Sequence, residues 1–190
     1  MDAGWLSFTM QLMRLLPVIF SLLLLAACKP KAPVRQPVPV SEDTTFLTGT
    51  FYFVRHAERY PGGADTTLAP EGFQRAGLLY ERLKNAHLDK IYLTPYLRCI
   101  QTADSLRIKQ KLDTCFYKAD TTGESLIYEI TRHGDWGKRI LVIGHSNTLV
   151  PAMRGLRAKP HMNMLGEDEY NWLFIVHKTS AGTSLTEDCY

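Results

Sequence analysis

Two histidines stand directly beyond hydrophobic segments that are typical of buried strands. His56 follows residues 51–55 (Phe-Tyr-Phe-Val-Arg), and His145 follows residues 140–144 (Ile-Leu-Val-Ile-Gly). In an α/β protein, ligands bind outside the carboxyl ends of the strands, so residues beyond two strand ends can meet there. One polar residue at a strand end is common, but the pair predicts a site in which two imidazoles act together.

Two arginines are expected at the same edge of the sheet. Arg55 directly precedes His56, and Arg98 follows a short strand that we predict at residues 89–93. A guanidinium offers a rigid fork of donors that matches phosphate geometry. Phosphoryl transfer mainly requires positioning and charge stabilisation, and histidine can itself be the covalent nucleophile. The four groups therefore predict an anion pocket for phosphoryl chemistry.

The elements that must position these groups alternate between strand and helix. Strands are predicted from short β-branched and aromatic segments, and helices from apolar residues at helical spacing. In chain order we expect a strand at 51–54, a helix from Pro70 to about 86, a strand at 89–93, a helix at 98–108, a strand at 114–117, a helix at 123–132, a strand at 140–143, a short helix with Pro151 in its first turn, and a strand at 171–177. This order predicts an α/β fold, a three-layer α/β/α sandwich with a mainly parallel central sheet.

Composition limits the classes of function. A chain of 190 residues is long enough for one domain with a sizeable core. The formal net charge of +3 is too small to indicate nucleic-acid binding, and no Lys/Arg block is present. We therefore expect no nucleic-acid partner.

The N-terminal residues predict export. Arg14 precedes an apolar segment at 15–25 that is too short to span a membrane but typical of a signal peptide, with Met13 or Met10 as the expected start. Residues 25–28 (Leu-Ala-Ala-Cys) resemble the lipobox of bacterial lipoproteins. This resemblance implies a signal peptide at 1–27 and lipidation of Cys28, which would anchor the chain to a membrane of the bacterial cell envelope. A plain signal peptide or a buried helix are the alternatives.

The remaining chain divides into three parts. Residues 28–45 carry alternating prolines that favour an extended tether, with an ordered surface arm as the alternative. Residues 46–180 form the predicted domain, and 181–190 are expected to be a C-terminal tail.

The cysteines after Cys28 and the other histidines do not indicate a disulfide framework or a metal site. After Cys28 an odd number of cysteines remains, so no disulfide framework is indicated, although one pair could oxidise on export. No CxxC or Cys/His zinc spacing is present, and we expect no metal. Core packing is the expected role of Cys99 and Cys115. Cys189 is the third remaining cysteine and is given no role. The histidines expected to be incidental are His87, His133, His161 and His177.

Three sequence blocks resemble the signature of the histidine phosphatase superfamily, also called phosphoglycerate mutase-like. They are residues 55–58, 94–103 and 142–148, and residues 68–76 resemble the family's LTxxGxxQA helix start. The resemblance spans about residues 50 to 178.

The resemblance assigns roles to the four groups. It implies that His56 is a nucleophile that becomes phosphohistidine, and that Arg55, Arg98 and His145 bind the phosphoryl group. It also implies that the reaction needs no cofactor. The fold would then serve a small phosphorylated substrate or a phosphoprotein.

The sequence departs from the family pattern in two places. Ala57 replaces the glycine of the usual Arg-His-Gly, which is a small change. The proton donor cannot be aligned, and Glu58, Asp120 and Glu124 are the candidates. Glu58 is the nearest to the nucleophile in sequence but could instead pair with an arginine, whereas carboxylates such as Asp120 and Glu124 are also typical of turns and helix starts.

The expected activity is therefore a metal-independent phosphatase that hydrolyses a phosphomonoester or a phosphohistidine. The alternative is a pseudoenzyme of the same fold that binds phosphorylated ligands but turns them over weakly or not at all. His-Ala-Glu at 56–58 also fits the H-x-E of zinc deaminases, but the P-C-x-x-C that they require is absent.

Overall fold

The centre of the fold is a six-stranded sheet in the order β3-β2-β4-β1-β5-β6. The computed structural model describes residues 47–63 and 65–190, which belong to one compact unit, Glu42–Tyr190. The strands are β1 (Gly49–Arg55), β2 (Lys90–Leu93), β3 (Asp113–Phe116), β4 (Arg139–Gly144), β5 (Trp172–Thr179) and β6 (Gly182–Cys189). The first four pair in parallel, and β5 and β6 extend the sheet in antiparallel fashion.

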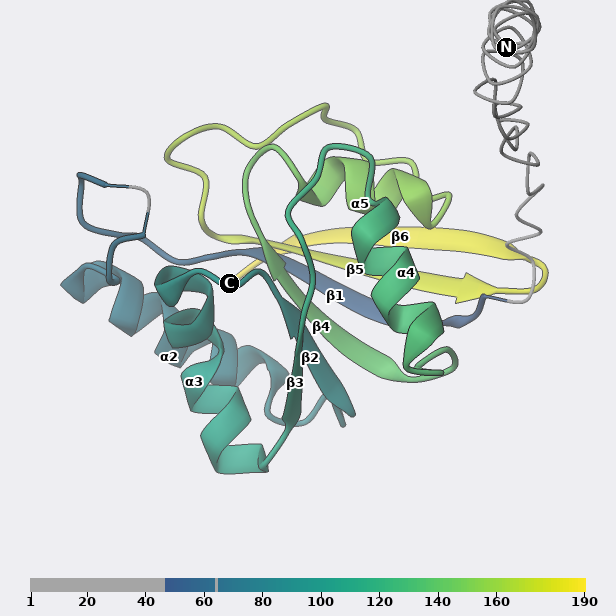
Figure 1. Ribbon diagram of the computed structural model, residues 1–190, viewed down its shortest axis with the longest axis horizontal. Coiled ribbons are helices and arrows are strands. Elements are labelled where there is room, and N and C mark those ends of the chain that lie inside the picture. The colour runs from purple at the N-terminus through teal and green to yellow at the C-terminus, as the bar shows by residue number, and fades with distance from the viewer. Residues whose placement is uncertain (1–46, 64) are drawn as a thin grey trace, which may run out of the picture. The chain divides into compact units, whose positions relative to one another are not determined.

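Helices cover both faces of this sheet (Figure 1). One layer holds α2 (Pro70–Leu83) and α3 (Leu97–Gln110), which also pack against each other. The other holds α4 (Glu124–Arg132) and α5 (Leu149–Gly155). The predicted three-layer α/β/α architecture with a mainly parallel sheet is confirmed.

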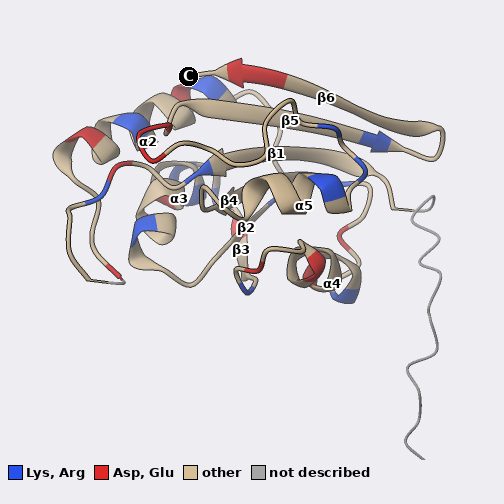
Figure 2. Cartoon of the chain, turned by 90° about the horizontal axis from the view of Figure 1, so that it is seen from above, with Lys and Arg blue, Asp and Glu red and all other residues tan. Residues whose placement is uncertain are grey.

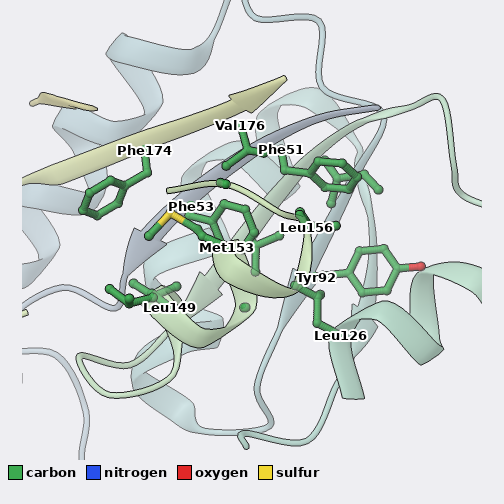
Figure 3. Packing of buried hydrophobic residues seen from close by; sticks show 14 of the residues in the cluster. Phe51, Phe53, Tyr92, Leu126, Leu149, Met153, Leu156, Phe174 and Val176 are labelled. Carbon is green, nitrogen blue, oxygen red and sulfur yellow. The ribbon is translucent and has the colours of Figure 1, made fainter. Parts of the chain in front are cut away.

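The central strands show why the chain folds this way. Successive side chains of a strand point to opposite faces, and in β1 and β4 both faces are apolar. Phe51 and Phe53 belong to the cluster under α4 and α5 (Figure 3), whereas Tyr52 and Val54 belong to the cluster under α2 and α3. Burial on both sides fixes the register of the strands. The register in turn fixes where the residues that follow each strand lie at the edge of the sheet.

The C-terminal residues correct one expectation. Residues 181–190 are not a tail, because Gly182–Cys189 forms β6 at the edge of the sheet. The strand has little apolar signal, since its side chains are exposed or half-buried and its pairing uses the backbone. Its acidic end lies beside α2 (Figure 2), where Asp188 accepts a hydrogen bond from Arg82 at 2.5 Å.

The three cysteines of the described residues are free, so no disulfide forms among them. Cys99 is buried in the core as expected, whereas Cys115 is half-buried on the edge strand β3. The predicted signal peptide at 1–27, Cys28 and the whole of the predicted tether at 28–45 lie outside the described residues. Within the described part, no helix combines the length and the apolar character that a membrane span needs.

Candidate active site

A polar cavity of about 550 Å³ lies beyond the carboxyl ends of β1, β2 and β4. Its volume falls within the range of small-molecule sites. Residues of all three predicted signature blocks line it, together with residues of two loops. The lining consists of Arg55, His56, Arg59, Tyr96, Arg98, Ala119, Asp120, Thr121, His145, Ser146, Asn147, Thr148, Glu167, Asp168 and Tyr170.

The backbone holds His56 at the end of β1. Its N–H donates to the carbonyl of Gly144 at 3.0 Å, which continues the pairing of β1 with β4. The next N–H, that of Ala57, donates to Thr102 Oγ1 at 2.9 Å, and this hydroxyl donates to the carbonyl of Arg98 at 2.7 Å. One turn of α3 is therefore tied directly to the residue after the proposed nucleophile.

The second block also holds the loop that leads into α2. Gln101 Oε1 accepts hydrogen bonds from the Leu68 N–H at 2.8 Å and from Thr67 Oγ1 at 2.9 Å. Gly72 packs against the backbone of Glu58 so closely that a Cβ would lie 2.1 Å from the Glu58 carbonyl oxygen. These contacts explain why the glutamine and the glycine accompany the histidine motif.

The environment of His56 keeps its imidazole neutral. Burial and, after it, the nearby His145, Arg98 and Arg55 together lower its pKa to about 3, against the effect of the hydrogen bond to Ala57. Nδ1 lies 2.8 Å from the Ala57 carbonyl, which can only accept, so the proton is assigned to Nδ1. Nε2 then carries the free lone pair.

His145 is also neutral, in the opposite tautomer. The hydroxyl of Thr94 donates to Cys99 Sγ at 3.2 Å and accepts from His145 Nε2 at 2.8 Å. His145 Nδ1 accepts from Arg98 Nη2 at 3.4 Å. Burial and then the charge of Arg98 lower the pKa of His145 to about 4. The rings of His145 and His56 lie 5.3 Å apart, so the structure brings the two predicted histidines together.

Each of the two predicted arginines stacks on a tyrosine. The guanidinium carbon of Arg98 lies 4.3 Å from the ring centre of Tyr96, and that of Arg55 lies 4.0 Å from the ring centre of Tyr170. Stacking fixes the plane of the guanidinium and thus the direction of its donors. The sequence analysis assigned no role to either ring, and Tyr170 lies in a loop without a recognisable motif.

Arg55 has a second role that the sequence did not predict. Its Nη1 donates to the carbonyls of Gly166 and Glu167, both at 2.7 Å, and so fastens the loop that closes one side of the cavity. Its Nε is buried without a hydrogen-bond partner among the described residues. Burial lowers the pKa of Arg55 from its ordinary value. A buried cationic donor without a partner is suited to a bound anion.

The structure separates two of the three proton-donor candidates from the cavity. Glu58 turns toward α2 and pairs with Arg75, with Oε1 and Nη2 2.6 Å apart. Glu124 lies in the first turn of α4 and borders a different hollow, with Tyr128 and Thr131. Neither carboxylate lines the cavity of His56.

Asp120 lines the cavity, but its carboxylate is engaged with backbone donors. Oδ1 accepts from the N–H groups of Thr122 and Gly123, and Oδ2 accepts from that of Ser125. Burial alone would raise its pKa, but these hydrogen bonds outweigh burial and lower the pKa. Asp120 is therefore an anion that orders the start of α4, and it is poorly suited to donate a proton.

Two exposed carboxylates that the sequence analysis missed also line the cavity. Glu167 and Asp168 lie in the loop that Arg55 fastens. No spacing or motif marks them, because only the folded loop brings them opposite the signature blocks. Among the carboxylates that line the described cavity, Asp120 accepts hydrogen bonds from backbone N–H groups. The side chains of Glu167 and Asp168 accept none from the described residues.

Fold and site together define an α/β protein with two histidines and two arginines gathered in a cavity at the carboxyl edge of its sheet. Residues 51–120 match the model of the histidine phosphatase superfamily (branch 1). The matched segment, which covers less than half of the chain, is similar to this superfamily and contains His56 and Arg98. A search of curated protein sequences finds no match.

Solved structures share the fold at low sequence identity. The protein histidine phosphatase SixA complexed with tungstate is 15% identical, with a TM-score of 0.58, over 74% of this chain and 96% of that one. A mutant phosphoserine phosphatase from Entamoeba histolytica in complex with phosphoserine is 16% identical, with a TM-score of 0.54, over 73% and 95%. A mycobacterial glucosyl-3-phosphoglycerate phosphatase is 14% identical, with a TM-score of 0.56, over 74% and 97%.

Proposed function

We propose that this protein is a phosphatase that hydrolyses a phosphomonoester or a phosphohistidine through a phosphohistidine on His56. The observation that carries the proposal is a neutral imidazole whose Nε2 is free, in a cavity lined by three arginines. The names of the structures with the same fold agree with phosphatase chemistry.

The first step is attack of His56 Nε2 on phosphorus. The N–P bond forms as the bond from phosphorus to the leaving oxygen or nitrogen breaks, and the leaving group takes up a proton. Arg98 and the Nε–H of Arg55 stabilise the charge on the equatorial oxygens. His145 adds a donor once the bound anion favours protonation of its Nδ1. An arriving phosphate oxygen would take the place of His145 Nδ1 as the acceptor for Arg98.

The second step returns the enzyme to its starting state. Water attacks the phosphorus of the phosphohistidine, the N–P bond breaks, and phosphate leaves while Nε2 regains its lone pair. The water proton passes to phosphate or to solvent. The Nδ1 hydrogen bond to Ala57 holds the ring in the same orientation through both steps.

The alternative is a pseudoenzyme that binds phosphorylated ligands. The observation that favours it is the engagement of Glu58 by Arg75 and of Asp120 by backbone donors. Without a proton donor, an alkoxide leaves slowly from a phosphomonoester. Glu167 and Asp168 are the carboxylates that could supply the proton if the enzyme is active.

Turnover of a chromogenic phosphomonoester and of phosphohistidine, each with a metal chelator present, tests the proposal. The phosphatase proposal expects metal-independent release of phosphate that vanadate inhibits. Vanadate binding without turnover of either substrate would instead establish the pseudoenzyme.

We also propose that the chain is exported and anchored to a membrane of the bacterial cell envelope through a lipid on Cys28. The support is the Leu-Ala-Ala-Cys sequence behind an apolar segment. Stable anchoring needs more than one acyl chain. Mass spectrometry of the mature N-terminus should find an acylated Cys28, and Cys28→Ser should abolish membrane sedimentation. An unmodified cysteine or cleavage elsewhere would contradict the anchor and leave the phosphatase proposal untouched.

A further inference from the structure

A second cluster of chemistry-bearing side chains lies between the edge strand β3 and α4. Cys115 comes from β3, Glu129 from the C-terminal half of α4, and His133 from the position directly after that helix. Their thiol, carboxylate and imidazole ligand atoms all lie within 4.8 Å of one another. None of the three lines the cavity of His56.

The separations are close to those of a tetrahedral zinc site. Zinc binds thiolate sulfur at about 2.3 Å and imidazole nitrogen at about 2.0–2.1 Å, so two such ligands stand about 3.6 Å apart. In the structure, Cys115 Sγ lies 3.7 Å from His133 Nδ1 and 3.8 Å from Nε2. Glu129 completes the set, since its carboxylate lies within 4.8 Å of the thiol and imidazole ligand atoms.

The imidazole is already oriented as a ligand. Glu129 and His133 are four residues apart, a spacing that places both on one side of the helix. Nδ1 of His133 donates to the backbone carbonyl of Glu129 at 2.8 Å, which leaves Nε2 to bind a metal. A second hydrogen bond of this kind accompanies most metal-binding histidines and fixes the ring.

We propose that Cys115, Glu129 and His133 form a binding site for zinc. Thiolate, imidazole and carboxylate are the three donor types that zinc uses in proteins, and a water would complete four ligands. A zinc ion at this site would join β3, the exposed edge of the parallel part of the sheet, to α4. The chain between these elements, residues 117–123, includes three residues of the cavity lining, so the ion would also hold that segment.

The surroundings permit an ion to enter. The side chains of Glu129 and His133 are 17% and 35% exposed, and Cys115 is half-buried. Among the described residues, the arginine that pairs with Glu129 is Arg132, at 3.4 Å, and its side chain is 60% exposed. Lys90 is held by Asp135 at 2.6 Å. Burial raises the pKa of the Cys115 thiol, so binding would release a proton from it.

Titration of the reduced full chain with Co²⁺ and then Zn²⁺ tests the site. Co²⁺ should bind with one equivalent and give a thiolate-to-cobalt charge-transfer absorption, which Zn²⁺ removes by displacement. Zinc at about 100 times its Kd should raise Tm by on the order of 5 °C. Circular dichroism of each variant checks that it is folded.

Variants separate this site from other places where a metal could bind. Cys115→Ala and His133→Gln should each weaken Zn²⁺ binding by more than about 100-fold and remove the absorption, since loss even of an outer partner costs about 10–100-fold. Cys189→Ser, at an exposed cysteine on β6, and His56→Ala should retain both. Absence of the charge-transfer absorption in the wild-type chain, or its persistence in Cys115→Ala, would overturn the proposal.

Discussion

The cavity beyond β1 and the cluster beside β3 both contain histidine, but their neighbours give the residue opposite uses. His56 and His145 are buried beside Arg55 and Arg98, whose charges lower the pKa of both rings. His133 is exposed beside a thiol and the carboxylate of Glu129. The first environment favours an anion beside neutral imidazoles, whereas the second favours a cation.

The difference shows that charge and burial, rather than residue type, decide the chemistry of a histidine. The low pKa of His56 results first from burial and then from nearby positive charge, and both effects keep Nε2 unprotonated. A phosphate would be drawn to the same positive charge. In the proposed mechanism, one set of groups therefore keeps the nucleophile unprotonated and also attracts its target.

The largest expected effect is on turnover when the buried histidine is removed. His56→Ala should lower kcat by on the order of 10³-fold or more, because a nucleophile that acts as part of a unit is lost. His133→Ala is the matched control and should keep turnover within about twofold. Phosphate release at saturating substrate measures both. If folded His56→Ala were as active as wild type, His56 would have no more part in turnover than His133.

The next effect concerns Arg98, which donates to His145 and stacks on Tyr96. Arg98→Ala should lower kcat/KM by about 10²–10³-fold, the loss expected for one donor to the transition-state charge. Arg98→Lys should recover little, since an ammonium cannot reproduce the fork that stacks on Tyr96. Vanadate inhibition should weaken in both variants. Unchanged inhibition in Arg98→Ala would assign this arginine to the fold alone.

A third effect is on stability as the pH falls. The folded-state pKa values of His56 and His145 are about 3 and about 4, below the ordinary value of 6.5, so the unfolded chain takes up protons first. Stability is unaffected by these groups above about pH 6.5 and falls from there toward pH 4, by at most about 1.4 kcal/mol per pH unit for each histidine.

Urea unfolding between pH 7 and pH 4.5 measures this slope. His56→Ala and His145→Ala should each have a shallower slope than wild type. The same slope in all three proteins would mean that the cavity histidines are not held neutral.

The smallest effect distinguishes a structural carboxylate from a catalytic one. Glu58→Gln should lower stability by about 1 kcal/mol through loss of its ion pair with Arg75, which is partly exposed. Turnover should stay within about twofold, because the carboxylate does not line the cavity. Asp168→Asn in the cavity loop gives the comparison. A loss of kcat above 10²-fold in Glu58→Gln would restore Glu58 as the proton donor.

Sequence alone predicted the parts of the molecule that depend on local pattern. The apolar segments at 51–54 and 140–143 predicted two strands of the sheet, because burial on both faces requires an uninterrupted apolar segment. The two histidines were predicted to meet because each follows one of these segments. Arg98 followed from a strand end and a sequence block. These predictions concern residues whose position is set by the element that carries them.

The sequence did not show the contacts that loops and edge strands make. Tyr170 and Asp168 reach the cavity through a loop whose course depends on Arg55, and nothing in their spacing marks them. β6 is held to β5 by backbone pairing and has no apolar pattern, so its sequence was interpreted as a C-terminal tail. Cys115 and His133 are brought together by β3 and α4, and their separation in the chain fits no zinc motif.

The central claim is that His56 carries the phosphoryl group during turnover. Rapid quenching of the enzyme with a phosphorylated substrate, followed by mass spectrometry under alkaline conditions that preserve phosphohistidine, tests it directly. The account predicts one phosphate on the peptide that contains His56, released by acid and absent from His56→Ala. Turnover with no phosphoenzyme, or with phosphate on a residue other than His56, would contradict it.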